Sequence, residues 1–125
     1  MTDADRELLE RADAAAERAY APYSDFHVGA AARTRDRRVF EGVNVENAAY
    51  PLGICAEKTA LSRAVSDGVR PGEVEALAVT ASPCGGCRQW FHEFRIERIV
   101  YRRPDGEVVV ATPAELLPDT FELEP

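Results

Sequence analysis

The chain has 125 residues, of which 46% are hydrophobic, and a formal net charge of −7 at pH 7. A chain of this length can bury roughly two-thirds of its unfolded surface, so we expect a single domain spanning residues 1–125. The acidic balance disfavours DNA or RNA as a partner, because nucleic-acid binding relies mainly on Lys and Arg side chains that neutralise phosphates. A small neutral ligand fits this composition better.

Apolar periodicity and chain-breaking residues divide the chain into alternating strands and helices. In chain order, we expect a helix over 3–19, a β-hairpin from His27–Arg33 and Val39–Val45, a helix over Cys55–Asp67, a strand over Glu75–Thr80, a helix over Cys84–Phe94, strands over Arg98–Arg102 and Glu107–Thr112, and a short helix over Pro113–Leu117. This order predicts an α/β fold with a parallel core sheet and helices on both faces. Both cysteine-bearing helices would then begin at the edge where such sheets bind ligands.

Neither a membrane span nor an export signal is expected from the sequence. No run of roughly 18 apolar residues occurs, and the first 19 residues are charged, with no apolar signal segment. The three cysteines cannot all pair with one another, which favours thiolate chemistry over disulfide bonds. We therefore expect a cytoplasmic protein without membrane contacts.

All three cysteines fall in two short motifs, Cys-Ala-Glu at 55–57 and Pro-Cys-Gly-Gly-Cys at 83–87. Three thiolates hold Zn²⁺ and leave a fourth position open for water, which is typical of catalytic zinc. This pattern is the known signature of zinc-dependent deaminases. We therefore predict that Cys55, Cys84 and Cys87 bind Zn²⁺ and that Glu57 carries protons. A structural zinc or iron–sulfur site is disfavoured because a fourth protein ligand is absent.

The charges around this cluster support the metal interpretation. Three thiolates outweigh the charge of Zn²⁺, and helix N-termini offset the excess with backbone N–H groups. Lys58, directly after Glu57, adds a full positive charge for charge balance at the zinc. Glu57 alone would otherwise be read as a solvated acid in a first helical turn, a common placement.

A second polar pair, Asn44 and Glu46, lies two residues apart in an expected strand. Such residues project to the same face of the strand, where they can bracket a hydroxyl group. The alternative interpretation is an Asn at the edge of a turn and a solvated Glu.

Taken together, the motifs resemble those of the cytidine deaminases of the small, homotetrameric, three-cysteine type. The resemblance covers nearly the whole chain, in segments 21–26, 28–31, 42–50, 55–57, 82–89 and 115–118, followed by Phe121. The family fold is a three-layer α/β/α sandwich with a five-stranded mixed sheet. Many relatives carry Arg directly after the catalytic Glu, so Lys58 keeps the charge but loses the forked guanidinium geometry.

The resemblance implies hydrolytic deamination of cytidine and 2′-deoxycytidine, with Glu57 as the catalytic residue and Zn²⁺ as the cofactor. It places a further set of residues at the nucleoside: Phe26, Asn44, Glu46, Tyr50, Ala56, Ser82 and Phe121. Asn44 and Glu46 would bind the ribose, the backbone around Ala56 and Ser82 would orient the base, and Phe121 would reach the site of a neighbouring subunit. A homotetramer is therefore expected.

Three other functions remain to be weighed. A deaminase of a modified aminopyrimidine nucleoside, such as a blasticidin-type antibiotic, is disfavoured by the ribose-type pair of Asn44 and Glu46. A nucleic-acid deaminase is disfavoured because Tyr101–Glu107 leaves room only for a turn between the last two strands. A non-enzymatic zinc-stabilised domain would have no use for Glu57.

Overall fold

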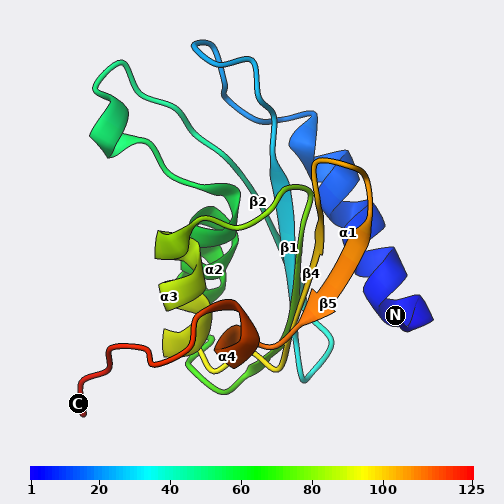
Figure 1. Ribbon diagram of the computed structural model, residues 1–125, viewed down its shortest axis with the longest axis vertical. Helices are drawn as coiled ribbons and strands as arrows, with labels where there is room; N and C mark the ends of the chain where they lie inside the picture. The colour runs from blue at the N-terminus through cyan, green and yellow to red at the C-terminus, as the bar shows by residue number, and fades with distance from the viewer.

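The computed structural model describes residues 1–125. It contains a five-stranded sheet between helices (Figure 1). The elements are α1 (Asp3–Ala16), β1 (Gly29–Thr34), β2 (Val39–Val43), a short 3₁₀ helix η1 (Tyr50–Leu52), α2 (Ala56–Ser66), β3 (Val74–Val79), α3 (Gly85–Glu93), β4 (Arg98–Arg102), β5 (Val108–Ala111) and α4 (Pro113–Leu116). The order of strands across the sheet is β2-β1-β3-β4-β5. The three-layer α/β/α fold with a mixed sheet is therefore confirmed.

The prediction of a parallel core sheet was wrong, because only β3 and β4 pair in parallel. The β1–β2 hairpin supplies an antiparallel pair, and β3 pairs antiparallel to the other side of β1. Two antiparallel steps leave β2 and β3 pointing the same way, with β1 between them. The chain therefore leaves β2 and β3 at the same edge of the sheet. The expectation that both cysteine motifs lie at that edge holds, although the strands that lead to them are not neighbours.

Helices cover both faces of the sheet (Figure 1), and each face has its own apolar cluster. On one face, α1 packs Leu8, Leu9 and Ala12 against small residues of β1 and β3. On the other face, α2 and α3 bury a larger cluster that includes Leu61 and Phe91. This second face carries the cysteine motifs.

Glycine at position 42 lets α2 approach the sheet closely. A Cβ atom there would lie 2.3 Å from the backbone nitrogen of Ala60 and 2.5 Å from the carbonyl oxygen of Ala56. Real Cβ atoms do not make such contacts with a helix backbone, so any side chain at Gly42 would push α2 outward. The position of the first turn of α2, and of Glu57 within it, thus depends on this glycine.

Most predicted element bounds hold within two residues, but α1 ends at Ala16 rather than at residue 19. The chain turns after Ala16 and brings Tyr20 beside the segment that follows β2, where the backbone of Tyr20 bonds to Asn44 and Glu46. The chain around Tyr20 thereby lies beside the loop after β2, at the edge of the sheet that carries the cysteine motifs. None of the helices combines the length and apolar character needed to cross a membrane.

Candidate metal centre and substrate pocket

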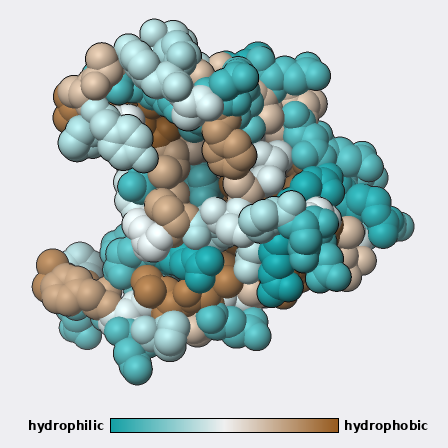
Figure 2. Space-filling view, turned by 45° about the horizontal axis from the view of Figure 1, so that its top comes forward, coloured by the Kyte–Doolittle hydropathy of each residue, from teal (hydrophilic) through white to brown (hydrophobic).

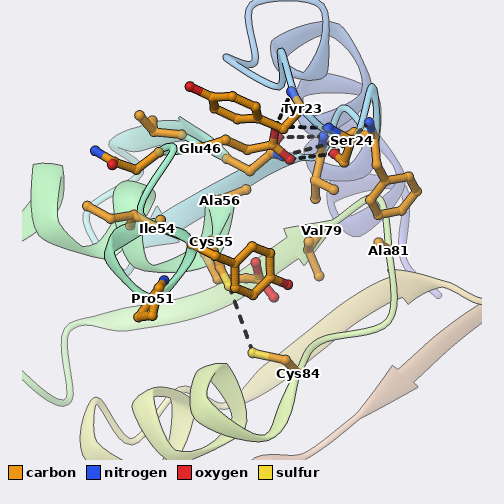
Figure 3. Close-up of a pocket in the computed structure, with 18 of the residues that line it drawn as sticks. Tyr23, Ser24, Glu46, Pro51, Ile54, Cys55, Ala56, Val79, Ala81 and Cys84 are labelled. Carbon is orange, nitrogen blue, oxygen red and sulfur yellow. Dashed lines mark hydrogen bonds between the residues drawn. The ribbon is translucent and has the colours of Figure 1, made fainter.

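The three cysteines come together at the N-terminal ends of α2 and α3. Cys55 is the N-cap of α2, Cys84 is the N-cap of α3, and Cys87 lies in the first turn of α3. Their Sγ atoms all lie within 4.8 Å of one another, and those of Cys55 and Cys84 are 3.8 Å apart (Figure 3). None of the three forms a disulfide.

This donor set fits zinc. A Zn–S bond of about 2.3 Å places sulfur atoms about 3.8 Å apart in a tetrahedron, which agrees with the Cys55–Cys84 separation. The backbone N–H of Cys87 donates to Cys84 Sγ at 3.5 Å, as expected for a thiolate at a helix N-terminus. Three protein ligands leave a position open for water or substrate.

The surroundings favour an ionised thiolate at Cys55. A hydrogen bond from the Cys87 thiol lowers the pKa of Cys55 to about 6, and the charge of Lys58 acts in the same direction. The Nζ atom of Lys58 lies close to α3. A Cβ atom added to Gly86, in the first turn of α3, would be 3.3 Å from this Nζ atom. The ammonium group thus lies near both cysteine helices.

Glu57 lies in the first turn of α2 and is only 4% exposed. Burial raises the pKa of Glu57 to about 7, and the nearby Cys55 charge adds to this effect. A carboxyl group with a pKa near neutral exchanges protons readily in both directions, which suits a general acid–base. Its side chain borders the same pocket as Cys55 and Cys84.

A pocket of about 780 Å³ opens beside the cysteines. Figure 2 shows one face of the molecule hollowed, with hydrophobic residues gathered beside the hollow. The predicted substrate contacts that line the pocket are Phe26, Asn44, Glu46, Tyr50, Ala56 and Ser82. Phe26 and Tyr50 are 61% and 90% exposed, so the rim is open in a single chain.

Asn44 and Glu46 both line this pocket, and both also hold the loop that contains Phe26. Asn44 accepts a bond from the Val28 N–H and donates one to the Phe26 carbonyl, both 2.8 Å long. Glu46 accepts bonds from the backbone N–H of Ser24 and from its hydroxyl group, as Figure 3 shows. Sequence reasoning missed these loop contacts. The only signal in the sequence was the turn-forming stretch that contains Ser24.

Phe121 is the one predicted substrate contact outside this pocket. It is 70% exposed and lies in the C-terminal tail. The tail is held on α3, where Gln89 donates to the Phe121 carbonyl at 2.8 Å and His92 contacts the side chains of Thr120 and Glu122. His92 therefore helps to hold the tail on α3.

A comparison with known proteins identifies the family. The sequence model of the cytidine and deoxycytidylate deaminase zinc-binding region matches residues 2–103. The chain belongs to this deaminase family. A cytidine deaminase of Sporosarcina psychrophila is 43% identical over 125 residues, which cover 94% of this chain and 90% of the relative. In the crystal structure of cytidine deaminase from Burkholderia pseudomallei, a chain with 48% identity superposes with a TM-score of 0.88, covering 97% of this chain and all of that one.

The blasticidin-type alternative is weaker. A blasticidin-S deaminase of Bacillus cereus is 31% identical, with coverage of 88% of this chain and 89% of the relative. That identity is lower than those of the cytidine deaminases above. The protein is thus a hydrolytic deaminase with zinc as its cofactor, in agreement with the cysteine cluster.

Proposed function

We propose that the protein hydrolyses cytidine and 2′-deoxycytidine to uridine and 2′-deoxyuridine plus ammonia. The observation that carries this proposal is the buried Glu57 carboxyl group beside three clustered thiols, in one pocket with Asn44 and Glu46. The carboxyl group and the thiols suit the hydrolysis of an amidine, and Asn44 and Glu46 suit the binding of a sugar. The identities with cytidine deaminases support the same substrate.

The residues of the chain divide the reaction between them. Zinc, when held by Cys55, Cys84 and Cys87, lowers the pKa of water toward about 7 and so supplies a nucleophile at neutral pH. Glu57 takes the proton from the water molecule that attacks C4 of the base. It gives this proton to the ring N3, then takes the proton of the hydroxyl group added at C4 and passes it to the leaving amino group, so one carboxyl group serves as base and acid in turn.

The remaining pocket residues orient the nucleoside. The backbone around Ala56 and Ser82 lies next to the cysteines and would align the base for attack. At the other end, Asn44 and Glu46 would hold sugar hydroxyl groups, with lone pairs and an N–H left over after their loop contacts. The ring of Phe26 would pack against the nucleoside and exclude water.

We further propose that four copies of the chain assemble and complete one another's sites. Tyr50, Phe26 and Phe121 are large apolar side chains exposed near the pocket or on the tail, which is unusual for a small protein without a partner. Light scattering coupled to size exclusion should give the mass of a tetramer. A fully active monomer at assay concentration would overturn this proposal.

Residues 1–125 would form one domain, because all five strands belong to a single sheet. Three unpaired cysteines fit a reducing compartment, which supports a cytoplasmic enzyme. A role in pyrimidine salvage follows from the proposed substrates.

The direct test is turnover of a panel of aminopyrimidine nucleosides by the purified protein. Cytidine and 2′-deoxycytidine should be converted with a much higher kcat/KM than a blasticidin-type nucleoside. If the antibiotic nucleoside were the better substrate, the proposed function would be wrong and the alternative correct.

A further inference from the structure

The hydroxyl group of Ser24 joins two parts of the pocket that contact different parts of the proposed substrate. It donates a hydrogen bond to one carboxylate oxygen of Glu46 and accepts one from the backbone N–H of Phe26 at 3.0 Å. The other oxygen of Glu46 accepts bonds from the backbone N–H groups of Tyr23 at 2.9 Å and Ser24 at 3.2 Å. Figure 3 shows these bonds gathered at the end of the pocket opposite Cys55 and Cys84.

The loop around Ser24 depends on these bonds for its shape. Residues 22–27 are exposed, so little apolar packing holds them. Asp25 has a φ of 58°, a left-handed conformation that non-glycine residues adopt only when their surroundings impose it. The backbone N–H of Asp25 bonds to the Ala21 carbonyl, and the Ser24 hydroxyl fixes the next residue, Phe26.

The bonds to Glu46 also fix the direction in which its carboxylate points. Three donors from the Tyr23–Ser24 segment bond to its two oxygens. The same contacts lower the pKa of Glu46, the Ser24 hydroxyl being the largest cause, so the group stays ionised as a hydrogen-bond acceptor. A carboxylate oriented before substrate arrives loses less rotational freedom on binding than a mobile one.

We propose that Ser24 is a positioning residue that sets the sugar-side carboxylate of Glu46 and the aromatic ring of Phe26 in a fixed relation to each other. This inference rests on the proposed function, in which Glu46 binds the sugar and Phe26 packs against the nucleoside. Because 2′-deoxycytidine is also a proposed substrate, the hydroxyl group that Glu46 recognises is the 3′ or the 5′ group. Ser24 thereby contributes to specificity for a sugar hydroxyl without touching the substrate.

The test uses kcat and KM of full-length Ser24→Ala and Ser24→Thr, with Ser66→Ala as a matched control. Ser66 is an exposed serine of α2 that bonds only to the Ser62 carbonyl, away from the pocket. Loss of one hydrogen bond to a charged group should lower kcat/KM of Ser24→Ala for cytidine about tenfold, mainly through KM. Ser24→Thr, which keeps a hydroxyl, should recover most of this loss, and zinc content should equal that of wild type in all variants.

A second readout separates positioning from general loosening of the fold. Cytidine is compared with 3′-deoxycytidine and 5′-deoxycytidine in wild type and in Ser24→Ala. Removal of the recognised hydroxyl group should cost wild type more than it costs Ser24→Ala, because the variant no longer holds Glu46 in place. Equal losses on all three substrates, loss of zinc, or Ser24→Ala activity within twofold of wild type would overturn the inference. If wild type itself failed to convert cytidine, the proposed function would be at fault instead.

Discussion

The two ends of the pocket are built in different ways. At the cysteine end, the side chains project from the N-caps and first turns of α2 and α3, and Ala56 and Cys87 belong to the large apolar cluster on that face. At the proposed sugar end, Asn44 and Glu46 lie beside the exposed loop 22–27, which is held mainly by hydrogen bonds. Well-packed helices fix a geometry more rigidly than loops do.

This difference indicates how the site divides its tasks. Proton transfer and metal binding need atoms placed within a fraction of an ångström, and they are supported by the core. The proposed sugar recognition tolerates more adjustment, and its residues lie on segments that other residues, or another subunit, could cover. Changes at the two ends should therefore separate chemistry from binding.

The largest effect is expected at the cysteine end, from Glu57→Gln. The amide keeps the shape of the side chain but cannot exchange protons, so turnover should fall about 10²- to 10⁴-fold. Zinc content and the melting temperature should stay close to wild type, because Gln removes the cost of a buried charge. Uridine formation and metal content are measured on the same samples. Turnover within a few-fold of wild type would remove Glu57 from the mechanism.

Smaller effects are expected at the sugar end, from Asn44→Ala and Glu46→Ala. Each variant loses a bond to a buried substrate hydroxyl and also frees part of the Phe26 loop, at a cost of roughly 1–3 kcal/mol in kcat/KM for cytidine. Zinc content should not change, because neither residue belongs to the metal-binding cluster. Unchanged kcat/KM in both variants would show that the sugar binds elsewhere.

Deletion of the tail from Asp119 onward tests whether a third segment completes the site. Loss of an aromatic contact from a neighbouring subunit should lower kcat/KM by roughly 1–2 kcal/mol, with zinc retained. Gln89→Ala should cause part of the same loss, since Gln89 holds the Phe121 carbonyl. A tail-deleted protein as active as wild type would exclude Phe121 from any site.

A substitution on the opposite face of the sheet should change the stability of the fold without changing turnover. Asp5 lies in the first turn of α1, is 1% exposed and accepts bonds from Arg33 and Arg98. Burial alone would raise the pKa of Asp5, but the bonds from Arg98 and Arg33 outweigh it and hold this pKa below its ordinary value. A lowered pKa in the folded state stabilises the fold above the unfolded value of roughly 4, and this stabilisation is lost as the pH falls toward the folded value.

Asp5→Asn should therefore lower the free energy of unfolding at pH 7 by about 1.5–3 kcal/mol. The gap between the variant and wild type should narrow as the pH falls below about 4, toward the lowered pKa of Asp5 in the folded state. Denaturant melts at several pH values measure this gap, and kcat at neutral pH should be unchanged. A gap that is constant down to pH 2 would show that the charge of Asp5 contributes nothing.

Sequence reasoning succeeded where local patterns decide the structure. The cysteine motifs start helices, and helix starts depend on neighbouring residues, so the placement of Cys55, Glu57 and Cys84 could be predicted. The strands that pair with β3 could not be predicted in this way, because its pairing with β1 and β4 joins segments that are far apart in the chain. The loop contacts of Asn44 were missed for a similar reason, since its partner Val28 lies across a hairpin.

Zinc removal and restoration tests the central claim most directly. Wild-type protein is dialysed against a chelator under reducing conditions, its metal content is measured, and conversion of cytidine to uridine is followed before and after one equivalent of Zn²⁺ is returned. The structure predicts one zinc ion per chain, loss of uridine formation with the metal, and recovery on its return. Uridine formation at an undiminished rate by metal-free protein would contradict the assignment of Cys55, Cys84 and Cys87 as the centre of the site.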